Sequence, residues 1–238
     1  MALPRINETL KFSLTVPSTG QTVKYRPYLV KEEKVLLQAF ESQDLKMILT
    51  TMCDTISSCL DDREEVDVLD LATFDVEYMF LQIRASSVGE NSTVVMKCKE
   101  CETENPVSFD VSTIEVDVGE VDSVVEITDE VSVEMRYPSY KGVATGATKE
   151  IDEKDPDSMI RMIADSIAAV LTEEERIDTS EIKAEEVVDF LDSLTANQFK
   201  KITDFLEGMP KLTHDVEFNC ENCNHLNKAQ LSGLADFF

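Results

Sequence analysis

The chain has 238 residues, of which 42% are hydrophobic, so it is long enough to bury a sizeable core in one or two domains. Its 48 acidic and 22 basic residues give a formal net charge of −26. This balance argues against nucleic-acid binding, which draws most of its free energy from Lys and Arg side chains that displace counterions. No apolar run approaches the roughly 18 residues that a transmembrane helix needs, so we expect no membrane span.

The N-terminal region, residues 1–90, is expected to form a β-hairpin followed by helices. Alternating residues 10–16 and 22–25 flank the turn sequence Pro17-Ser-Thr-Gly20, a pattern that predicts two paired strands. Apolar residues then recur at helical spacing over 32–41, 44–60 and 75–86. Cys53 and Cys59 fall in the second of these helices, six residues apart, which is a poor spacing for sharing a metal ion. We interpret both as small core residues.

Residues 91–139 form an acidic, β-rich region that contains the first of two cysteine pairs, Cys98-Lys-Glu-Cys101. Alternating segments at 92–97 and 106–110 predict a hairpin with this pair at its tip, and further strands are predicted at 114–118 and 131–135. Twelve carboxylates and no Lys or Arg lie between Glu100 and Glu134. We interpret them as a solvated face; the alternative is a surface that meets a basic protein partner.

A polar loop at residues 140–154 is the best candidate for a domain boundary, and residues 155–211 are predicted to be a bundle of three antiparallel helices. The first helix begins at Asp155-Pro156 and carries an apolar stripe to about Leu171. The second runs over about 182–194. The third begins at the capping-box sequence Thr195-Ala-Asn-Gln198 and ends near Gly208.

The second cysteine pair, Cys220-Glu-Asn-Cys223, lies in residues 212–238, which are expected to pack back on residues 91–110. Two such pairs can supply the four thiolate ligands that a structural zinc ion prefers. With four protein ligands bound, the ion would have no open coordination position for catalysis. We therefore predict one structural zinc ion per chain, bound by Cys98, Cys101, Cys220 and Cys223. No secretory signal opens the chain, so reduced thiols are expected.

Two histidines are alternative zinc ligands, but their spacing argues against both. His225 lies two residues beyond Cys223, and His214 lies six residues before Cys220. The apolar residues Leu231, Leu234, Phe237 and Phe238 follow the second pair and would either dock on their own domain or anchor a partner. No motif for nucleophilic, hydride-transfer or phosphoryl-transfer chemistry is present, so the chain is predicted to be non-enzymatic.

The predicted fold is therefore α+β, with helical N- and C-terminal regions around a small antiparallel β-module that carries a zinc-ribbon-like four-cysteine site. Several blocks also resemble the baseplate hub proteins of T-even-like contractile-tailed phages. These blocks are Met1–Asn7, Lys24–Lys34, Phe74–Arg84, Ser87–Glu90, Phe190–Thr195, Met209–Leu212 and Gly233–Phe238.

The resemblance implies a virion-assembly role without catalysis. The chain would be a component or assembly factor of the tail baseplate hub, made in the host bacterial cytoplasm, with other baseplate hub proteins as partners and the virion tail as its possible destination. Two other hypotheses are open: an acidic zinc-ribbon regulator that binds host or phage transcription proteins, and an enzyme in which zinc supports a carboxylate-based site.

Overall fold

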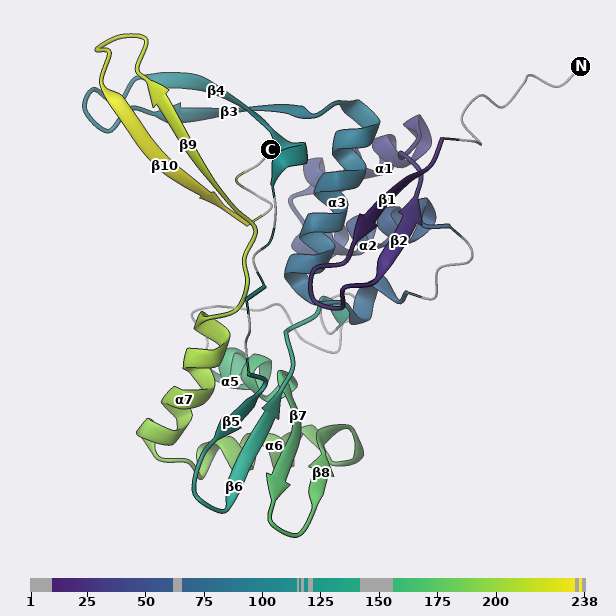
Figure 1. Ribbon diagram of the computed structural model, residues 1–238, viewed down its shortest axis with the longest axis vertical. Helices are drawn as coiled ribbons and strands as arrows, with labels where there is room; N and C mark the ends of the chain where they lie inside the picture. Colours follow the sequence, from purple (N-terminus) through teal and green to yellow (C-terminus); the bar gives the residue numbers. More distant parts are fainter. Residues whose placement is uncertain are drawn as a thin grey trace, which may run out of the picture. The chain divides into compact units, whose positions relative to one another are not determined.

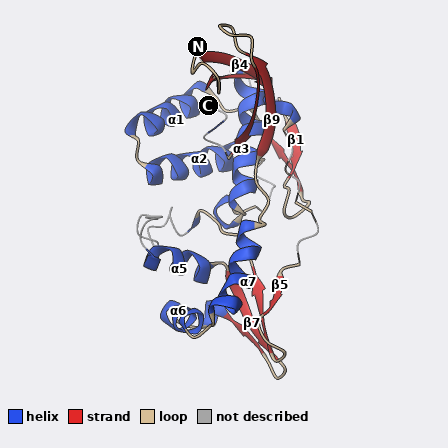
Figure 2. Cartoon of the chain, turned by 90° about the vertical axis from the view of Figure 1, so that its left-hand side faces the viewer, coloured by secondary structure: helices blue, strands red, loops and turns tan. Residues whose placement is uncertain are grey.

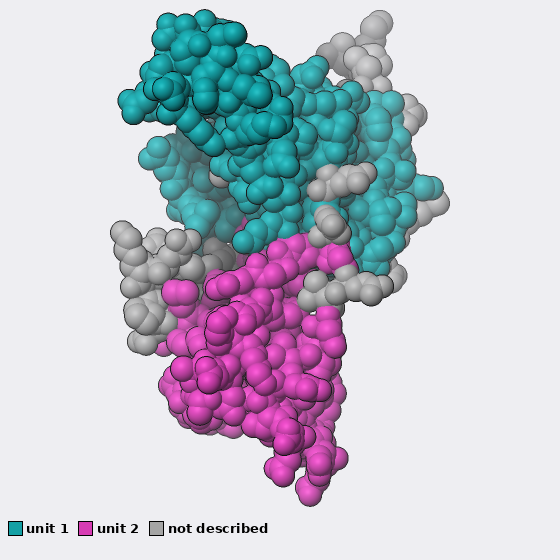
Figure 3. Space-filling view, turned by 60° about the vertical axis from the view of Figure 1, so that its left-hand side comes forward, with its two compact units in different colours: residues 1–117, 211–238 teal, residues 118–210 magenta. Residues whose placement is uncertain are grey.

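The computed structural model describes residues 10–61, 66–114, 116, 118–119, 122–141, 156–233 and 236, and for residues 156–158 the backbone only. Helices and small antiparallel sheets are mixed along the chain, which confirms the predicted α+β class. The chain divides into two compact units (Figure 3): Met1–Asp117 together with Lys211–Phe238, and Val118–Pro210. Within the described ranges, no helix has both the length and the apolar character needed to cross a membrane.

The first unit begins with the predicted hairpin. β1 (Phe12–Thr15) pairs antiparallel with β2 (Thr22–Tyr25). Asp75, at the start of helix α3 (Thr73–Val88), holds the turn between the strands. Its carboxylate accepts hydrogen bonds from the backbone N–H of Ser18 at 2.8 Å and from the Ser18 hydroxyl. Asp75 is fully buried, and this burial raises the pKa of its carboxyl above the ordinary value, although the bonds from Ser18 act in the opposite direction.

The three predicted N-terminal helices are confirmed. α1 (Val30–Ser42) and α2 (Leu45–Cys59) form a helical hairpin (Figure 2), and α3 lies beside them. α1 ends where Gln43 adopts a left-handed conformation with φ of 56°. Asp44 then caps α2, because its side chain accepts a hydrogen bond from the backbone N–H of Met47 at 3.0 Å.

Two further hairpins complete the first unit. β3 (Asn91–Lys97) pairs with β4 (Glu104–Asp110), and β9 (Thr213–Asn219) pairs with β10 (Leu226–Ser232). The two hairpins are far apart in sequence but lie side by side, with β4 in contact with β9 (Figure 1). Their inner faces share a core with α3 and the adjoining segments, made of Leu81, Ala85, Val107, Phe109, Val111, Ile114, Leu212, Val216 and Leu231. This core anchors both hairpins to the helical part of the unit.

The second unit consists of a four-stranded antiparallel sheet covered by helices. The sheet has the order β5 (Val124–Glu126), β6 (Val131–Met135), β7 (Ile167–Thr172), β8 (Arg176–Asp178). Helices α5 (Pro156–Asp165), α6 (Ala184–Asp192) and α7 (Ala196–Glu207) pack on one face of it (Figure 2). Their shared core is centred on the buried side chains Val133, Met135, Ile163, Ile167, Val187, Leu191 and Ile202.

The opposite face of this sheet is polar. Arg176 on β8 pairs with Glu134 on β6 at 2.8 Å and with Asp178 at 3.0 Å. These pairs raise the pKa of Arg176, and the pKa of Asp178 is lowered to about 2, first by the Ser180 hydroxyl and backbone N–H and then by Arg176. The sheet therefore has one buried and one solvated face, which is the usual state of an antiparallel sheet.

The prediction of a three-helix bundle over 155–211 is wrong in one element. The first helix ends at Asp165, and Ile167–Thr172 form strand β7 between β6 and β8. The apolar run Ile167-Ala-Ala-Val-Leu171 satisfies helical and strand spacing equally well, so periodicity alone could not separate the two. The helices at 184–192 and 196–207 are confirmed, including the capping box between Thr195 and Gln198.

Two other predictions concern connecting segments of the chain, at residues 114–118 and 140–154. A strand was predicted at 114–118, but none of its described residues, Ile114, Val116 and Val118, belongs to a strand; Ile114 follows a 3₁₀ turn at Val111–Thr113 and is buried in the core. The loop predicted at 140–154 lies, apart from Tyr140 and Lys141, outside the described residues.

Candidate metal centre

The first cysteine pair occupies the turn between β3 and β4, which we call the first knuckle (residues 98–105). Its backbone is closed by hydrogen bonds from the N–H of Cys98 to the carbonyl of Thr103 and from the N–H of Glu102 to the carbonyl of Cys98, both at 2.9 Å. Glu102 adopts the left-handed conformation, with φ of 57°. The turn therefore directs both sulfur atoms to the same side of the hairpin tip.

The second knuckle (residues 220–227), between β9 and β10, repeats this backbone structure. The N–H of Cys220 bonds the carbonyl of His225 and the N–H of Asn224 bonds the carbonyl of Cys220, again at 2.9 Å, and Asn224 has φ of 57°. Each strand boundary and each cysteine of the second hairpin lies 122 positions after its counterpart in the first. The two hairpins are thus an internal structural repeat, although few of their residues are identical.

The four sulfur atoms meet where the two knuckles face each other. All four lie within 4.8 Å of one another, with 3.7 Å between the Sγ atoms of Cys98 and Cys223 and 3.5 Å between those of Cys101 and Cys220. No disulfide joins them. In a tetrahedral site with Zn–S bonds of about 2.3 Å, neighbouring sulfur atoms are about 3.8 Å apart. Four thiols at these distances could hold a metal ion.

Two buried asparagines that the sequence analysis did not single out connect the knuckles. The Oδ1 atom of Asn227 accepts a hydrogen bond from the N–H of Lys99 at 2.9 Å, and the Oδ1 atom of Asn105 accepts one from the N–H of Glu221 at 2.8 Å. Each asparagine lies seven positions after the first cysteine of its own knuckle and bonds the residue that follows the first cysteine of the other. We call this pair of interactions the asparagine brace.

The amide groups of the brace also bind within their own knuckles. The Nδ2 group of Asn105 donates to the carbonyl of Thr103 at 2.7 Å, and that of Asn227 donates to the carbonyl of His225 at 3.0 Å and to the sulfur of Cys98 at 3.5 Å. Asn105 and Asn227 are only 1% and 2% exposed. The shared pattern Cys-x-x-Cys-x-x-x-Asn is the sequence signal that could have identified them.

The electrostatics of the cluster lower the pKa of Cys98 and of Cys101 and raise that of Cys223. The Thr103 hydroxyl, 3.3 Å from the sulfur, and the Thr103 backbone N–H lower the pKa of Cys101 to about 6. The backbone N–H of His225 also favours a thiolate at Cys223, but the other thiols of the cluster outweigh it and raise the pKa of Cys223 to about 12. Four closely spaced thiolates repel one another, so full ionisation requires a cation among them.

The family model described as "T4 bacteriophage base plate protein" matches residues 8–238, which is nearly the whole chain. The chain belongs to this family. No curated protein and no solved structure gives a match. As a bacteriophage baseplate protein, it has its protein partners in the baseplate, and its destination is the virion tail.

The remaining predicted candidates of this baseplate protein lie elsewhere. Among the residues that the structure describes, the four cysteines are the one group of side chains close enough together to hold a metal ion. The ring of His214, on β9, packs against that of Phe109 with 5.4 Å between the ring centroids, and His225 contributes its carbonyl to the knuckle backbone. Cys53 and Cys59 are buried in α2, which raises the pKa of both thiols to about 11, so the interpretation as core residues is confirmed.

Proposed function

We propose that the protein is a non-enzymatic component or assembly factor of the tail baseplate hub, which acts through protein contacts and contains a structural zinc clasp. The match of the baseplate family model to residues 8–238 carries this proposal. The protein would be made in the host bacterial cytoplasm and meet other hub proteins there before or during incorporation into the tail.

One zinc ion per chain, bound by Cys98, Cys101, Cys220 and Cys223, is the metal part of the proposal. The donor set supports zinc, because four thiolates in a tetrahedral arrangement with no free position are typical of structural zinc sites. The sulfur separations of 3.5 and 3.7 Å support it as well. Bound zinc would stabilise the contact between the two hairpins and leave no coordination position for catalysis.

Exposed apolar side chains on α1 support a function through protein contacts. Val30, Leu37 and Phe40 are 64%, 57% and 41% exposed, and their spacing of seven and three residues places them on one face of the helix. Leu45, at the start of α2, is 58% exposed. Such groups of apolar side chains on a protein surface commonly mark interfaces with other proteins.

Acidic residues set the character of the second unit. Residues 118–210 contain 23 Asp and Glu residues against 9 Lys and Arg residues, so this unit has a net charge of −14 of the total of −26. A surface of this kind favours basic partner surfaces and repels further copies of the same chain. It supports contacts with different proteins of the baseplate over self-assembly.

Mass spectrometry of mature virions and of isolated hub assembly intermediates tests the proposed role. The protein should be present in both if it is a structural subunit, and in the intermediates alone if it is an assembly factor. Its absence from both would refute the hub assignment.

A variant tests the α1 surface in the same assay. The double substitution Leu37→Glu and Phe40→Glu should reduce incorporation into hub intermediates while leaving the circular dichroism spectrum and metal content unchanged. Gln38→Glu, which adds a carboxylate on another face of the same helix, is the matched control. Equal incorporation of both variants would exclude this surface as the hub contact.

A further inference from the structure

The sulfur atoms of the cluster form two pairs that each join one knuckle to the other. The Sγ atoms of Cys98 and Cys223 are 3.7 Å apart, and those of Cys101 and Cys220 are 3.5 Å apart. Because the second hairpin repeats the first 122 positions later, Cys98 corresponds to Cys220 and Cys101 to Cys223. Exchange of the two hairpins therefore converts one pair into the other, and we expect the same chemistry of both.

Each pair combines one buried and one accessible cysteine. Cys98 and Cys220 are 1% and 2% exposed, whereas Cys223 is exposed and Cys101 is partly exposed. An oxidant in solution can therefore reach the second cysteine of each knuckle, and the first cysteine of the opposite knuckle lies beside it. An accessible thiol that is oxidised to a sulfenic acid condenses with a neighbouring thiol to form a disulfide.

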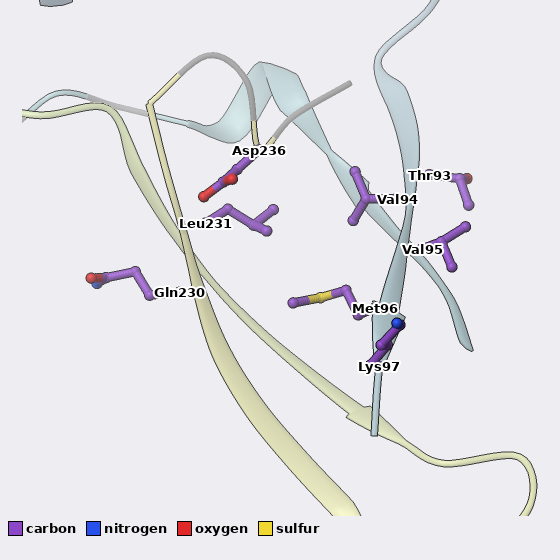
Figure 4. Close-up of a pocket in the computed structure, with 8 residues that line it drawn as sticks. All are labelled: Thr93, Val94, Val95, Met96, Lys97, Gln230, Leu231 and Asp236. Carbon is purple, nitrogen blue, oxygen red and sulfur yellow. The ribbon is translucent and has the colours of Figure 1, made fainter. Parts of the chain in front are cut away.

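A small movement would bring each pair to bonding distance. An S–S bond is about 2.05 Å long, so the sulfur atoms of a pair must approach by about 1.5 Å. β4 contacts β9, but a groove of about 670 Å³ lies between β3 and β10. Figure 4 shows Met96 and Leu231 pointing into this groove, and Lys97, which precedes Cys98, also lines it. The hairpins can therefore approach each other on this side without compressing a packed interface.

Contacts that involve no sulfur atom keep the two pairs aligned. The asparagine brace joins the knuckles through the N–H groups of Lys99 and Glu221, and the hairpins share an apolar core with α3. These contacts do not require a bound metal ion. Because the sulfur contacts of 3.5 and 3.7 Å both cross between the knuckles, the geometry favours disulfides between the knuckles over disulfides within one Cys-x-x-Cys pair.

We propose that the four-cysteine cluster is also an oxidation site, at which a peroxide converts the thiols into the disulfides Cys98–Cys223 and Cys101–Cys220. In each pair, the accessible sulfur attacks one peroxide oxygen and the O–O bond breaks, which gives a sulfenic acid and a water molecule. The buried sulfur then attacks the sulfenic sulfur, so that the S–S bond forms and a second water molecule leaves. Two thiols lose two electrons and two protons, and the peroxide is reduced to water. A bound zinc ion would be released, since its ligands are consumed.

Oxidation would replace the metal clasp by a covalent one. A Cys101–Cys220 disulfide closes the same loop around the second unit as a shared metal ion does. Disulfides persist at virion surfaces, and the virion tail is the destination of this baseplate protein. The two hairpins would thus stay joined after the metal is lost. This inference goes beyond the proposed zinc site and does not depend on it, because the thiols are equally close without a metal ion.

Disulfide mapping by mass spectrometry tests this proposal on the full-length protein. Protein as purified, and the same protein after treatment with a chelator, is oxidised with hydrogen peroxide and unfolded in the presence of iodoacetamide. It is then cleaved after glutamate without reduction. Glu100 and Glu221 each lie between the two cysteines of a knuckle, so this cleavage places the four cysteines in four different peptides. Linked peptides then identify each disulfide directly.

We expect both samples to give the peptide of Cys98 linked to that of Cys223, and the peptide of Cys101 linked to that of Cys220. Cys53 and Cys59, each 1% exposed in α2, are internal controls that should remain reduced and become alkylated. Disulfides within one knuckle, disulfides between two chains, or alkylation of all four cluster thiols in either sample would overturn the proposal. Purified protein without zinc would refute the zinc clasp alone.

Two variants and a protease assay check the pairing. In Cys223→Ser, Cys98 should be alkylated while the Cys101–Cys220 disulfide still forms, and Cys101→Ser should give the opposite result. Loss of both disulfides in both variants would contradict two separate pairs, and the wild-type map decides if a variant fails to fold. After oxidation, a chelator should no longer accelerate proteolysis of the β9–β10 hairpin, and dithiothreitol should restore this effect. Faster proteolysis of the oxidised protein would count against a covalent clasp.

Discussion

Substitution of one residue of the asparagine brace should weaken metal binding although neither asparagine is a candidate ligand. Asn227→Ala removes the acceptor of the Lys99 N–H and the donor to the His225 carbonyl and the Cys98 sulfur. A buried donor left without an acceptor costs about 1–3 kcal/mol, and a typical hydrogen bond contributes about 1 kcal/mol. Because Lys99 is at the surface, the lower part of this range applies, and the module should lose about 2–3 kcal/mol in total.

Part of this loss should appear as reduced zinc affinity. Without Asn227, the second knuckle no longer fixes the backbone that follows Cys98, so the four thiols lose part of their arrangement before the ion binds. Removal of a hydrogen-bond partner behind a metal ligand typically lowers affinity 10- to 100-fold, or about 1.4–2.7 kcal/mol, which agrees with the sum from the hydrogen bonds. Asn105→Ala should give a comparable loss, since its contacts mirror those of Asn227.

Competition for zinc with a chromophoric chelator measures this effect. Asn222→Ala is the matched control, because Asn222 belongs to the same knuckle but is exposed, and its amide donates to a side chain, the Thr103 hydroxyl, at 3.3 Å. The Co²⁺ spectrum of each variant should still indicate four sulfur ligands. Wild-type zinc affinity in both Asn227→Ala and Asn105→Ala would refute the argument that the brace prepares the site.

Further predictions address each unit and the metal separately. Protein purified without added metal should contain about one zinc ion per chain by elemental analysis, and Cys220→Ser should lose this metal and show faster proteolysis of the C-terminal hairpin. Ile202→Ala, in the core of the second unit, should destabilise that unit by about 2–5 kcal/mol and leave the zinc content unchanged. Asp75→Ala should destabilise the first unit more than Asp75→Asn, which keeps an acceptor for Ser18. The pKa of Asp75 is raised in the folded state, so the folded protein keeps this proton at pH values where the unfolded chain has lost it. The wild type should therefore lose stability as the pH rises above the ordinary carboxyl range. Its denaturation midpoint should fall relative to that of Asp75→Asn.

Local sequence signals predicted the elements whose chemistry is local. The turn Pro17–Gly20 and the capping box at Thr195 each depend on a few adjacent residues, and each is present in the structure. The two Cys-x-x-Cys spacings likewise predicted two hairpin tips and the cluster of four sulfur atoms. Each hairpin tip is a local structure, whereas the sulfur cluster also requires the two hairpins to pack against each other.

The errors concern residues whose conformation is set by distant partners. Ile167–Thr172 is a strand because β6 and β8 offer it backbone hydrogen bonds on both edges, and neither partner is visible in its own sequence. Asn105 and Asn227 were missed for the same reason, since each acts on the opposite knuckle, 122 positions away. A comparison of the two cysteine segments with each other would have shown the shared asparagine.

The second unit is inserted in the sequence of the first, and this insertion affects how much the proposed zinc ion stabilises the folded chain. The chain leaves the first unit after residue 117 and returns at residue 211, so an ion shared by Cys101 and Cys220 closes a loop that contains the whole second unit. In the chain-entropy model, a cross-link around a loop of this length lowers the entropy of the unfolded state and so stabilises the folded state by about 4–5 kcal/mol at 25 °C. Any strain in the native site reduces this stabilisation. This value applies to a loop that is flexible when the clasp is open. If the second unit remains folded, it already restricts the distance between its two ends, so the cross-link removes less entropy and stabilises the fold less. Chelation of the metal should therefore release the β9–β10 hairpin and reduce the free energy of unfolding by much less than the full value for a flexible loop. The difference between the measured loss and that value would show how independently Val118–Pro210 folds.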